Sequence, residues 1–187
     1  MVEAVVVAAG LSSRAGGWKP AFDLGGLTVI ERCLLGMYQY CSRIVVVGGY
    51  RFDSLVKILE KYEKVELVYN QDYEEGMLSS VLKGFGQIRG PRFFYLPGDY
   101  PLISQTVYET LLKQDEEIVI PAFQGITGHP VLFQTKVVKL LLDSPKYLNL
   151  REFIASREKT IVEVADPGVL IDIDTKEDYR QIVGCFY

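Results

Sequence analysis

Two cations follow a glycine-containing loop near the start of the chain. Residues 5–7 form an apolar run without polar alternation, which predicts a buried strand. The glycines that follow at positions 10, 16 and 17 leave room for backbone N–H groups to approach an anion. Arg14 offers a planar fork of donors to phosphate oxygens, and Lys19 adds a point charge on a flexible stem. Strand, amide loop and cations together indicate a site for a nucleoside triphosphate.

Two common phosphate-binding motifs do not fit this loop. A Walker A loop needs a second glycine five positions after the first, and that position is Ala15. The dinucleotide fingerprint needs Gly-x-Gly, whereas Leu11 and Ser12 follow Gly10. The loop instead resembles the A-A-G-x-S-x-R-x-G-x-x-K motif of the nucleotidyltransferases with a MobA-like fold, and residues 8–19 match every fixed position. The resemblance implies an NTP site made by Ala8, Ala9, Gly10, Leu11, Ser12, Ser13, Arg14 and Lys19.

Asp99 follows an apolar run at residues 93–96 that predicts a strand. An aspartate in this position is commonly a turn residue or a helix cap. At the carboxyl edge of a parallel sheet, however, its carboxylate would repel a triphosphate unless a divalent cation lay between them. The segment also resembles the family's Gly-Asp-x-Pro motif, which implies that Asp99 binds Mg²⁺ and is catalytic together with the two cations of the loop. Pro97 and Gly98 then belong to the nucleotide site.

A second pair of carboxylates lies near the C-terminus. Residues 169–173 predict a strand, and residues two apart on a strand share a face, so Asp172 and Asp174 should point the same way. Such a pair is costly without a cation or hydrogen-bond donors. The alternative is that Asp174 only caps the last helix. The sequence Asp-Ile-Asp-Thr-x-x-Asp, ending at Asp178, resembles the family's C-terminal motif with Lys176 where proline is common, and it implies a second metal contact at Asp172 or Asp174.

Two further segments resemble the family. Residues 76–84 are similar to its Gly-x-x-x-Ser segment, which implies base or ribose contacts from Gly76, Ser79 and Ser80. The alternative is a helix start with a packing glycine. His129, in the sequence Gly-His-Pro-Val, matches a segment on the acceptor side. It either contacts a phosphate or a pterin, or it holds its own loop.

Strands and helices alternate over the first two thirds of the chain. Strands are expected at residues 43–47, 65–69, 93–96 and 117–120, and helices at 28–40, 53–62, 77–85 and 104–112. Thr28 and Glu31 have the Thr-x-x-Glu spacing of a capping box, and Ser104 can cap the helix at 104–112. The strand at 65–69 ends at Asn70, and a loop is expected at 71–76. Beyond them the expected order is a loop at 122–128, an antiparallel strand at 129–133, short helices at 135–142 and 150–156, strands at 160–164 and 169–173, and a helix from 175. With the resemblance, this order predicts a single MobA-like domain over residues 1–187, with a three-layer α/β/α Rossmann-like nucleotidyltransferase fold and a mostly parallel sheet.

Composition restricts the class of protein. The chain has 187 residues, 49% of them hydrophobic and 24% charged, as in ordinary soluble globular proteins. A net charge of −4 argues against binding to nucleic acid or to a membrane surface. The N-terminus carries Glu3 and lacks the basic region of a signal peptide, so we expect a cytoplasmic protein. Cys33, Cys41 and Cys185 form no Cys-x-x-Cys pair and are expected to have structural roles.

The resemblance covers residues 8–178 and implies transfer of a nucleotidyl group from an NTP to a small phosphorylated acceptor, with release of pyrophosphate and with Mg²⁺ as cofactor. The Ala-Ala-Gly start of the motif is most similar to the molybdenum-cofactor cytidylyltransferase branch, which implies CTP, molybdopterin and contact with a molybdoenzyme or its chaperone. The guanylyltransferase branch, which uses GTP, and the sugar-phosphate nucleotidyltransferases are alternatives. A nucleotide-binding module without turnover is the alternative outside the enzymes.

Overall fold

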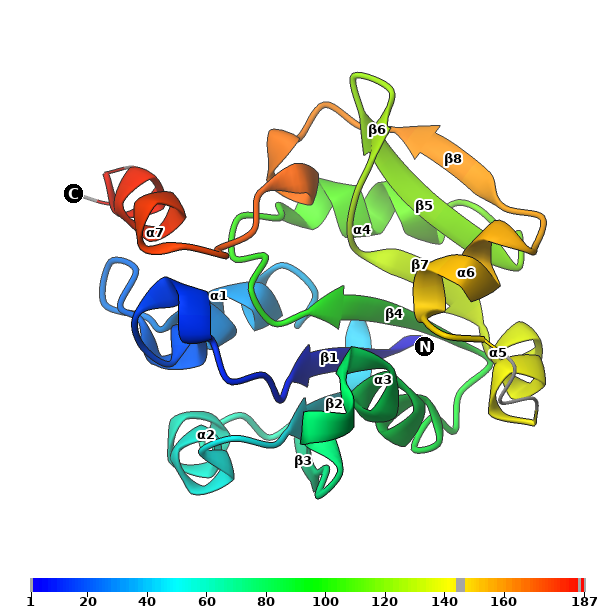
Figure 1. The fold of residues 1–187 in the computed structure, drawn as a ribbon. Coiled ribbons are helices and arrows are strands. Elements are labelled where there is room, and N and C mark those ends of the chain that lie inside the picture. The colour runs from blue at the N-terminus through cyan, green and yellow to red at the C-terminus, as the bar shows by residue number, and fades with distance from the viewer. Residues whose placement is uncertain (1, 144–146, 185, 187) are drawn as a thin grey trace.

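A parallel sheet forms the centre of the fold (Figure 1). The computed structural model describes residues 2–143, 147–184 and 186. Strand β1 (Val2–Ala8) lies between β2 (Cys41–Gly48) and β4 (Arg92–Pro97), and β3 (Val65–Tyr69) pairs with the other side of β2, all four running parallel. Most residues of β1 and β2 are buried whichever face they point to, which explains their unbroken apolar runs.

The other half of the sheet contains antiparallel pairs. Strand β7 (Val131–Gln134) runs antiparallel to β4 on one side and to β5 (Ile118–Phe123) on the other. Strand β6 (Ile126–Thr127) forms a hairpin with β5, and β8 (Thr160–Glu163) lies parallel beside β5. Over the described residues, one eight-stranded sheet results, in the order β3-β2-β1-β4-β7-β5-β6 with β8 off this path. The expected antiparallel strand after His129 is confirmed, although it begins at Val131.

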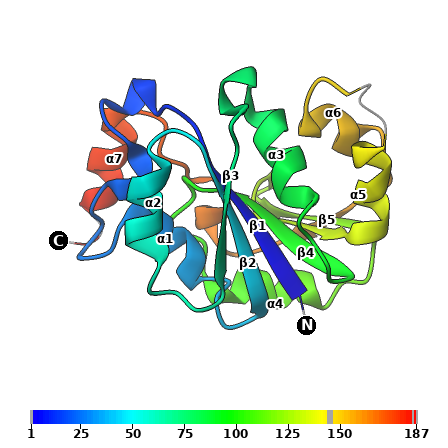
Figure 2. The same cartoon turned by 90° about the horizontal axis from the view of Figure 1, so that it is seen from below.

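Helices cover both faces of this sheet (Figure 2). They are α1 (Val29–Leu35), α2 (Phe52–Leu59), α3 (Met77–Phe85), α4 (Gln105–Leu112), α5 (Thr135–Leu142), α6 (Leu150–Ala155) and α7 (Lys176–Val183). Ala4 and Val6 of β1 belong to a buried core shared with α1, α2 and α4, whereas Val5 belongs to a second core shared with α3, α5 and α6. Successive side chains of a strand point to opposite faces, so one strand supplies both cores. The prediction of a three-layer α/β/α fold is confirmed.

The expected strand at residues 169–173 is wrong. The chain there forms a short 3₁₀ helix, η4 (Pro167–Leu170), whose first turn is held by a 2.8 Å hydrogen bond from Gly168 N to the Asp166 carboxylate. The segment after η4 is not part of the sheet. Instead, Ile173 N donates to the carbonyl of Asp99 at 3.0 Å. Proline and glycine in the turn break the strand pattern, and the segment crosses the carboxyl edge of the sheet.

Three other expectations differ from the structure. Helix α1 ends at Leu35 rather than near Tyr40, because glycine follows it at position 36 and is a poor helix former. The expected loop at 122–128 contains the end of β5 and all of β6. Gln124 and Gly125 both adopt positive φ, at 51° and 78°, which is the geometry of a tight hairpin turn. Ser104 precedes α4, but its hydroxyl pairs with the Thr106 hydroxyl rather than capping the helix.

The cysteines that the structure describes lie in the core. Cys33 and Cys41 are free and buried, which agrees with the structural role expected of them, and Cys185 lies outside the described residues. Burial raises the pKa of Cys41 to about 12, so its thiol is neutral at physiological pH. Among the helices that the structure describes, none combines the length and the apolar character needed to cross a bilayer.

Candidate active site

A pocket of about 360 Å³ opens at the carboxyl edge of the parallel strands. One wall is the loop after β1, its base includes the residues that end β4, and the opposite wall is the 3₁₀ helix η3 (Tyr73–Glu75) with the start of α3. Ligands bind at this edge in open parallel sheets. The predicted nucleotide-site residues that line the pocket are Ala8, Ala9, Gly10, Leu11, Ser12, Arg14, Lys19, Gly76, Ser80, Pro97 and Gly98. The side chain of Ser13 lies outside what the structure describes.

The loop after β1 is fixed at its base and strained at its centre. Gly98 N donates to Val7 O at 2.8 Å, and Tyr50 N donates to Ala9 O at 3.2 Å. Ser12 then adopts the left-handed conformation, with φ 55° and ψ 29°. A serine in this region costs on the order of 1 kcal/mol or more, and such strain is concentrated at binding sites. The loop is therefore held in a shape that its local preferences do not favour.

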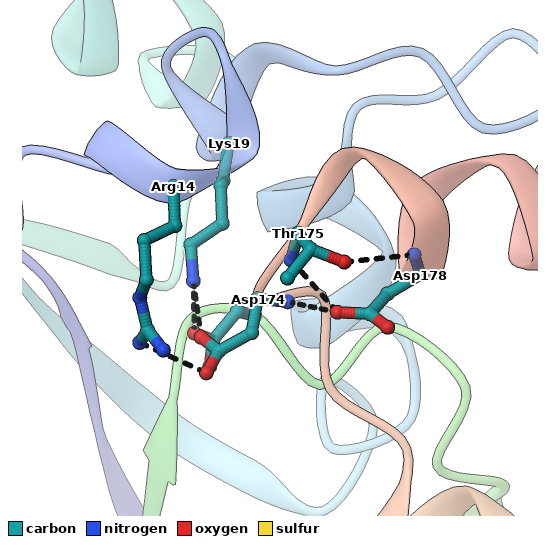
Figure 3. A network of polar contacts seen from close by, with 6 residues as sticks. Arg14, Lys19, Asp174, Thr175 and Asp178 are labelled. Atoms are coloured by element: carbon teal, nitrogen blue, oxygen red, sulfur yellow. Dashed lines mark hydrogen bonds and ion pairs between the residues drawn. The ribbon is translucent and has the colours of Figure 1, made fainter.

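Both predicted cations point toward Asp174 (Figure 3). Arg14 extends from the 3₁₀ helix η1 (Ser13–Ala15), and its Nη2 lies 2.9 Å from Asp174 Oδ2. Lys19 begins the 3₁₀ helix η2 (Lys19–Ala21), and its Nζ lies 2.7 Å from Asp99 Oδ2 and 3.2 Å from Asp174 Oδ1. The buried neighbours Trp18 and Pro20 anchor Lys19, whose side chain is 14% exposed, whereas Arg14 is 73% exposed. Lys19 is thus the more firmly held cation.

Three carboxylates meet beside these cations. Ligand oxygens of Asp99, Asp172 and Asp174 all lie within 4.8 Å of one another. Asp99 follows β4, and the other two come from the segment after η4, which the hydrogen bond from Ile173 N to Asp99 O brings alongside. The sequence therefore predicts the grouping correctly, although the strand expected to create it does not form. Oxygen ligands in such a group suit a hard divalent cation.

The carboxylate cluster changes proton affinities in its surroundings. Burial lowers the pKa of Lys19, but the charges of Asp99 and Asp174 and their hydrogen bonds outweigh this effect and raise it. Burial raises the pKa of Asp172, and the like charges of Asp99 and Asp174 raise it further. Arg14 and Lys19 therefore do not neutralise the whole carboxylate cluster, and the remaining negative charge acts on Asp172.

Asp174 is oriented by the start of α7. Asp174 N and Thr175 N donate to the Asp178 carboxylate at 3.0 and 2.7 Å, and Asp178 N donates to Thr175 Oγ1 at 3.2 Å (Figure 3). This reciprocal capping box satisfies the backbone donors of Thr175 and Asp178. Asp178, rather than Asp174, is therefore the helix-capping carboxylate. The Asp174 side chain is left to face Arg14 and Lys19.

The opposite wall of the pocket is built around Asn70. This buried residue donates from Nδ2 to the hydroxyls of Ser79 and Ser80, both at 2.9 Å. The Ser79 hydroxyl also donates to backbone carbonyls of Asp72 and Gly76, so it is engaged in holding the turn. Ser80 lines the pocket, and Ser79 does not belong to its lining. The sequence placed Asn70 at the end of a strand without giving it a role.

His129 lies outside the pocket lining, on the other side of β4. Its ring packs against Tyr100 and Tyr95, with ring centroids 4.8 and 5.7 Å away. Its backbone N–H donates to Val169 O at 2.9 Å, and its buried Nδ1 has no hydrogen-bond partner. Burial, followed by the charge of Arg151, lowers the pKa of His129 to about 4. The imidazole is therefore neutral at physiological pH.

The sequence did not indicate five of the residues that line the pocket, namely Val7, Pro20, Tyr73, Glu74 and Met77. Met77 is 63% exposed and Leu11, on the facing wall, is 53% exposed, so the pocket offers apolar surface at its mouth. A flat heterocycle packs favourably against such surface. For Tyr73 and Glu74 the available signal was the expected loop at 71–76, which follows a strand at the same edge of the sheet as the other site loops.

Comparisons with known proteins agree with this geometry. The profile of a family described as "MobA-like NTP transferase domain" matches residues 4–161. The molybdenum cofactor cytidylyltransferase of Escherichia coli K12 is 27% identical over 95% of this chain and 93% of its own length. A nucleotidyl transferase from Methanothermobacter thermautotroptrophicus has the same fold, with a TM-score of 0.87 at 23% identity over 100% of this chain and 97% of that one. Rv0371C of Mycobacterium tuberculosis H37Rv, solved as a complex with manganese, gives a TM-score of 0.78 at 19% identity over 98% of each chain.

Proposed function

The chain belongs to the MobA-like NTP transferase family, and on this basis we propose that it transfers a nucleotidyl group from an NTP to a phosphorylated acceptor and releases pyrophosphate. The observation that carries the proposal is the convergence, in one pocket, of an open amide loop, Arg14 and Lys19, and the carboxylates of Asp99 and Asp174. A triphosphate needs the loop and the cations, and the carboxylates are explained by a divalent cation.

We propose Mg²⁺ as this cation. The donor set fits, because Asp99, Asp172 and Asp174 offer oxygen ligands within 4.8 Å of one another and hard cations prefer such ligands. When bound, the ion supplies charge neutralisation at the phosphates. The manganese in the Rv0371C structure supports a divalent cation in a protein of this fold, without distinguishing Mg²⁺ from Mn²⁺.

Arg14 and Lys19 are proposed to hold the β- and γ-phosphates. In this structure they pair with Asp99 and Asp174, and we expect them to exchange these carboxylates for phosphate oxygens. Their charges, with the amides of residues 9–12, then stabilise the negative charge that develops on the leaving pyrophosphate. Asp99 is catalytic through the metal, and Ser80 and Gly76 are placed to contact the ribose or the base.

The acceptor phosphate attacks the α-phosphorus in line, on the side of the cluster occupied by Asp172, Tyr100 and His129. A phosphate dianion is already nucleophilic, so this step requires no general base. His129 is consistent with a step that needs no general base, because a pKa of about 4 leaves its imidazole a weak base. Its ring packs on Tyr100. We propose that these rings form an uncharged wall for an aromatic acceptor such as a pterin.

We propose CTP as the nucleotide and molybdopterin or the molybdenum cofactor as the acceptor. The cytidylyltransferase similarity supports both. Ala9 supports CTP, because it lines the pocket where the guanylyltransferase motif has glycine, and an added methyl group would crowd a purine more than a pyrimidine. Contact with a molybdoenzyme or chaperone, a cytoplasmic setting and one domain over residues 1–187 belong to the same proposal.

The test is release of pyrophosphate with each of the four NTPs, with and without molybdopterin, in Mg²⁺. We expect release that depends on molybdopterin and a higher kcat/KM for CTP than for GTP. Equal values or a GTP preference would reject the cytidylyl assignment but keep nucleotidyl transfer. Release with a sugar phosphate instead of molybdopterin would change the acceptor. NTP binding without release from any acceptor would leave a binding module.

A further inference from the structure

Lys176 lies directly on the phosphate loop. Gly16 ends η1 with φ +71°, and a Cβ atom added to it would meet Lys176 Cε at 1.7 Å and Nζ at 2.7 Å. The lysine stem therefore crosses the bare backbone of Gly16, in space that only glycine leaves open. Lys176 is the first residue of α7, two positions after Asp174, so the same chain segment reaches both Arg14 and Gly16.

Lys176 differs from the other two cations of the site in its ion pairing. Arg14 and Lys19 both form ion pairs with carboxylates of the cluster. Among the described residues, no carboxylate forms an ion pair with the Lys176 ammonium. Its side chain is exposed and lies against the loop that carries Arg14. An unpaired cation at this place is explained by a ligand of opposite charge.

We propose that Lys176 is a third phosphate-binding residue, which contacts the terminal phosphates of the NTP from the α7 side of the loop. The inference rests on the proposed NTP substrate and adds a residue to that site. The triphosphate carries more negative charge than Arg14 and Lys19 neutralise. The carboxylate cluster also competes with the phosphates for both of these cations. Because Lys176 lies on Gly16, which directly follows the short helix that carries Arg14, its contact should reach the β- and γ-phosphates that Arg14 is proposed to hold and not the α-phosphate.

The test compares affinities for CTP, CMP and inorganic pyrophosphate in Mg²⁺ by calorimetry. Lys176→Met keeps most of the stem and removes the charge, and Lys176→Arg keeps the charge. Lys176→Pro removes the amine at a backbone position that accepts proline, because the first helical residue needs no N–H partner and Thr175 is already extended. Lys57→Met, on the exposed side of α2, is the matched control.

We expect Lys176→Met and Lys176→Pro to bind CTP and pyrophosphate about five- to tenfold more weakly and CMP unchanged, with Lys176→Arg within about twofold of wild type. If Lys176→Met binds CTP like wild type, or loses affinity for CTP and CMP equally, the lysine is only a packing residue. The inference then fails while the proposed function stands. If the wild-type protein binds no NTP, the proposed function fails and the inference with it. Unfolding midpoints show that each variant is folded.

Discussion

At the scale of single residues, the two cations of the phosphate loop have different surroundings. Lys19 lies 2.7 Å from Asp99 with 14% of its side chain exposed, whereas Arg14 contacts Asp174 with 73% exposed. Solvent and salt screen an exposed pair much more than a partly buried one. Lys19 should therefore contribute more to nucleotide binding, and Arg14 should lose its contribution more readily as salt increases.

Substitution of Lys19 tests this difference. Lys19→Ala is expected to lower NTP affinity at least tenfold, which is the scale of one charge-assisted hydrogen bond of about 1.5–3 kcal/mol. Arg14→Ala should have a smaller effect at high salt. Binding is measured by calorimetry with Mg²⁺, and Lys57→Ala, exposed on α2, serves as the control. Wild-type affinity in Lys19→Ala would show that the loop does not bind the triphosphate.

At the scale of elements, Glu31 joins the start of α1 to the chain that follows α2. Its carboxylate accepts hydrogen bonds from Thr28 N and Thr28 Oγ1, both at 2.7 Å, and from Tyr62 OH at 2.8 Å. Lys61 Nζ lies 2.7 Å away. The bond from Thr28 N, with the 3.4 Å bond from Glu31 N to Thr28 Oγ1, forms the capping box that the Thr-x-x-Glu spacing predicts. The contacts from Tyr62 and Lys61 are tertiary.

This network predicts an acid-dependent loss of stability. Burial raises the pKa of Glu31, but the hydrogen bonds from Lys61, Thr28 and Tyr62 outweigh it and hold the pKa at about 2, below the ordinary 4.5. A lowered folded-state pKa gives stability that is complete above about pH 4.5 and is lost as the pH falls toward 2. Glu31→Gln should cost about 1–2 kcal/mol near pH 7 and progressively less below pH 4.5.

Urea unfolding of wild type and Glu31→Gln between pH 7 and pH 2.5 measures this effect. Glu60→Gln, exposed at the end of α2, is the control and should follow the wild-type curve. A difference between wild type and Glu31→Gln that stays constant down to pH 2.5 would contradict the assigned pKa shift.

Helix α3 depends on a glycine for its contact with the sheet. A Cβ atom on Gly84 would lie 2.5 Å from Val5 Cγ1 and 2.9 Å from Val47 Cγ2, so the helix packs on β1 and β2 at a distance that only glycine permits. We expect Gly84→Ala to lower the free energy of unfolding by about 1–3 kcal/mol, the range for overpacked cores. Gly86→Ala, where the nearest atom is 3.4 Å away, is the matched control. Equal stabilities of the two variants in urea would contradict this packing role.

At the scale of the whole molecule, the site forms where distant parts of the chain converge. The loop after β1, Asp99 in the turn after β4 and the segment after η4 meet at one edge of the sheet. The segment after η4 is tied to β4 by the backbone bond from Ile173 to Asp99 and to the loop by Arg14 and Lys19. The acidic cluster therefore exists only in the complete fold.

The proposed metal site predicts non-additive mutational effects. Asp99→Ala and Asp172→Ala should each lower kcat about a hundredfold or more, and the double variant should be little worse, because the residues act through one ion. Removal of divalent ions with EDTA should abolish turnover, and added Mg²⁺ should restore it. Asp143→Ala, exposed at the end of α5, is the control. Losses that multiply in the double variant would mean separate roles, and an active Asp172→Ala would move the second ligand to Asp174.

The sequence by itself determined the local features of this protein. Apolar runs predict β1 to β4, and helical spacing predicts α2, α3, α5 and α6 within a few residues. The Thr-x-x-Glu spacing predicts the capping box of α1. Loop composition and strand order together predict that Arg14, Lys19 and Asp99 share one edge, because the carboxyl ends of parallel strands meet there.

Only the tertiary structure decided how the remaining parts meet. Asp172 and Asp174 approach Asp99 through a segment outside the sheet, which a backbone hydrogen bond from Ile173 to Asp99 holds in place, and not through the strand that their spacing predicts. Asn70 orients the second wall, and Lys176 rests on Gly16, through side-chain contacts between segments that are separated along the chain. Local sequence patterns predict which face of a helix or strand is buried, but they do not predict which loops lie against each other. Those contacts depend on the complete packing of the sheet and its two helical layers.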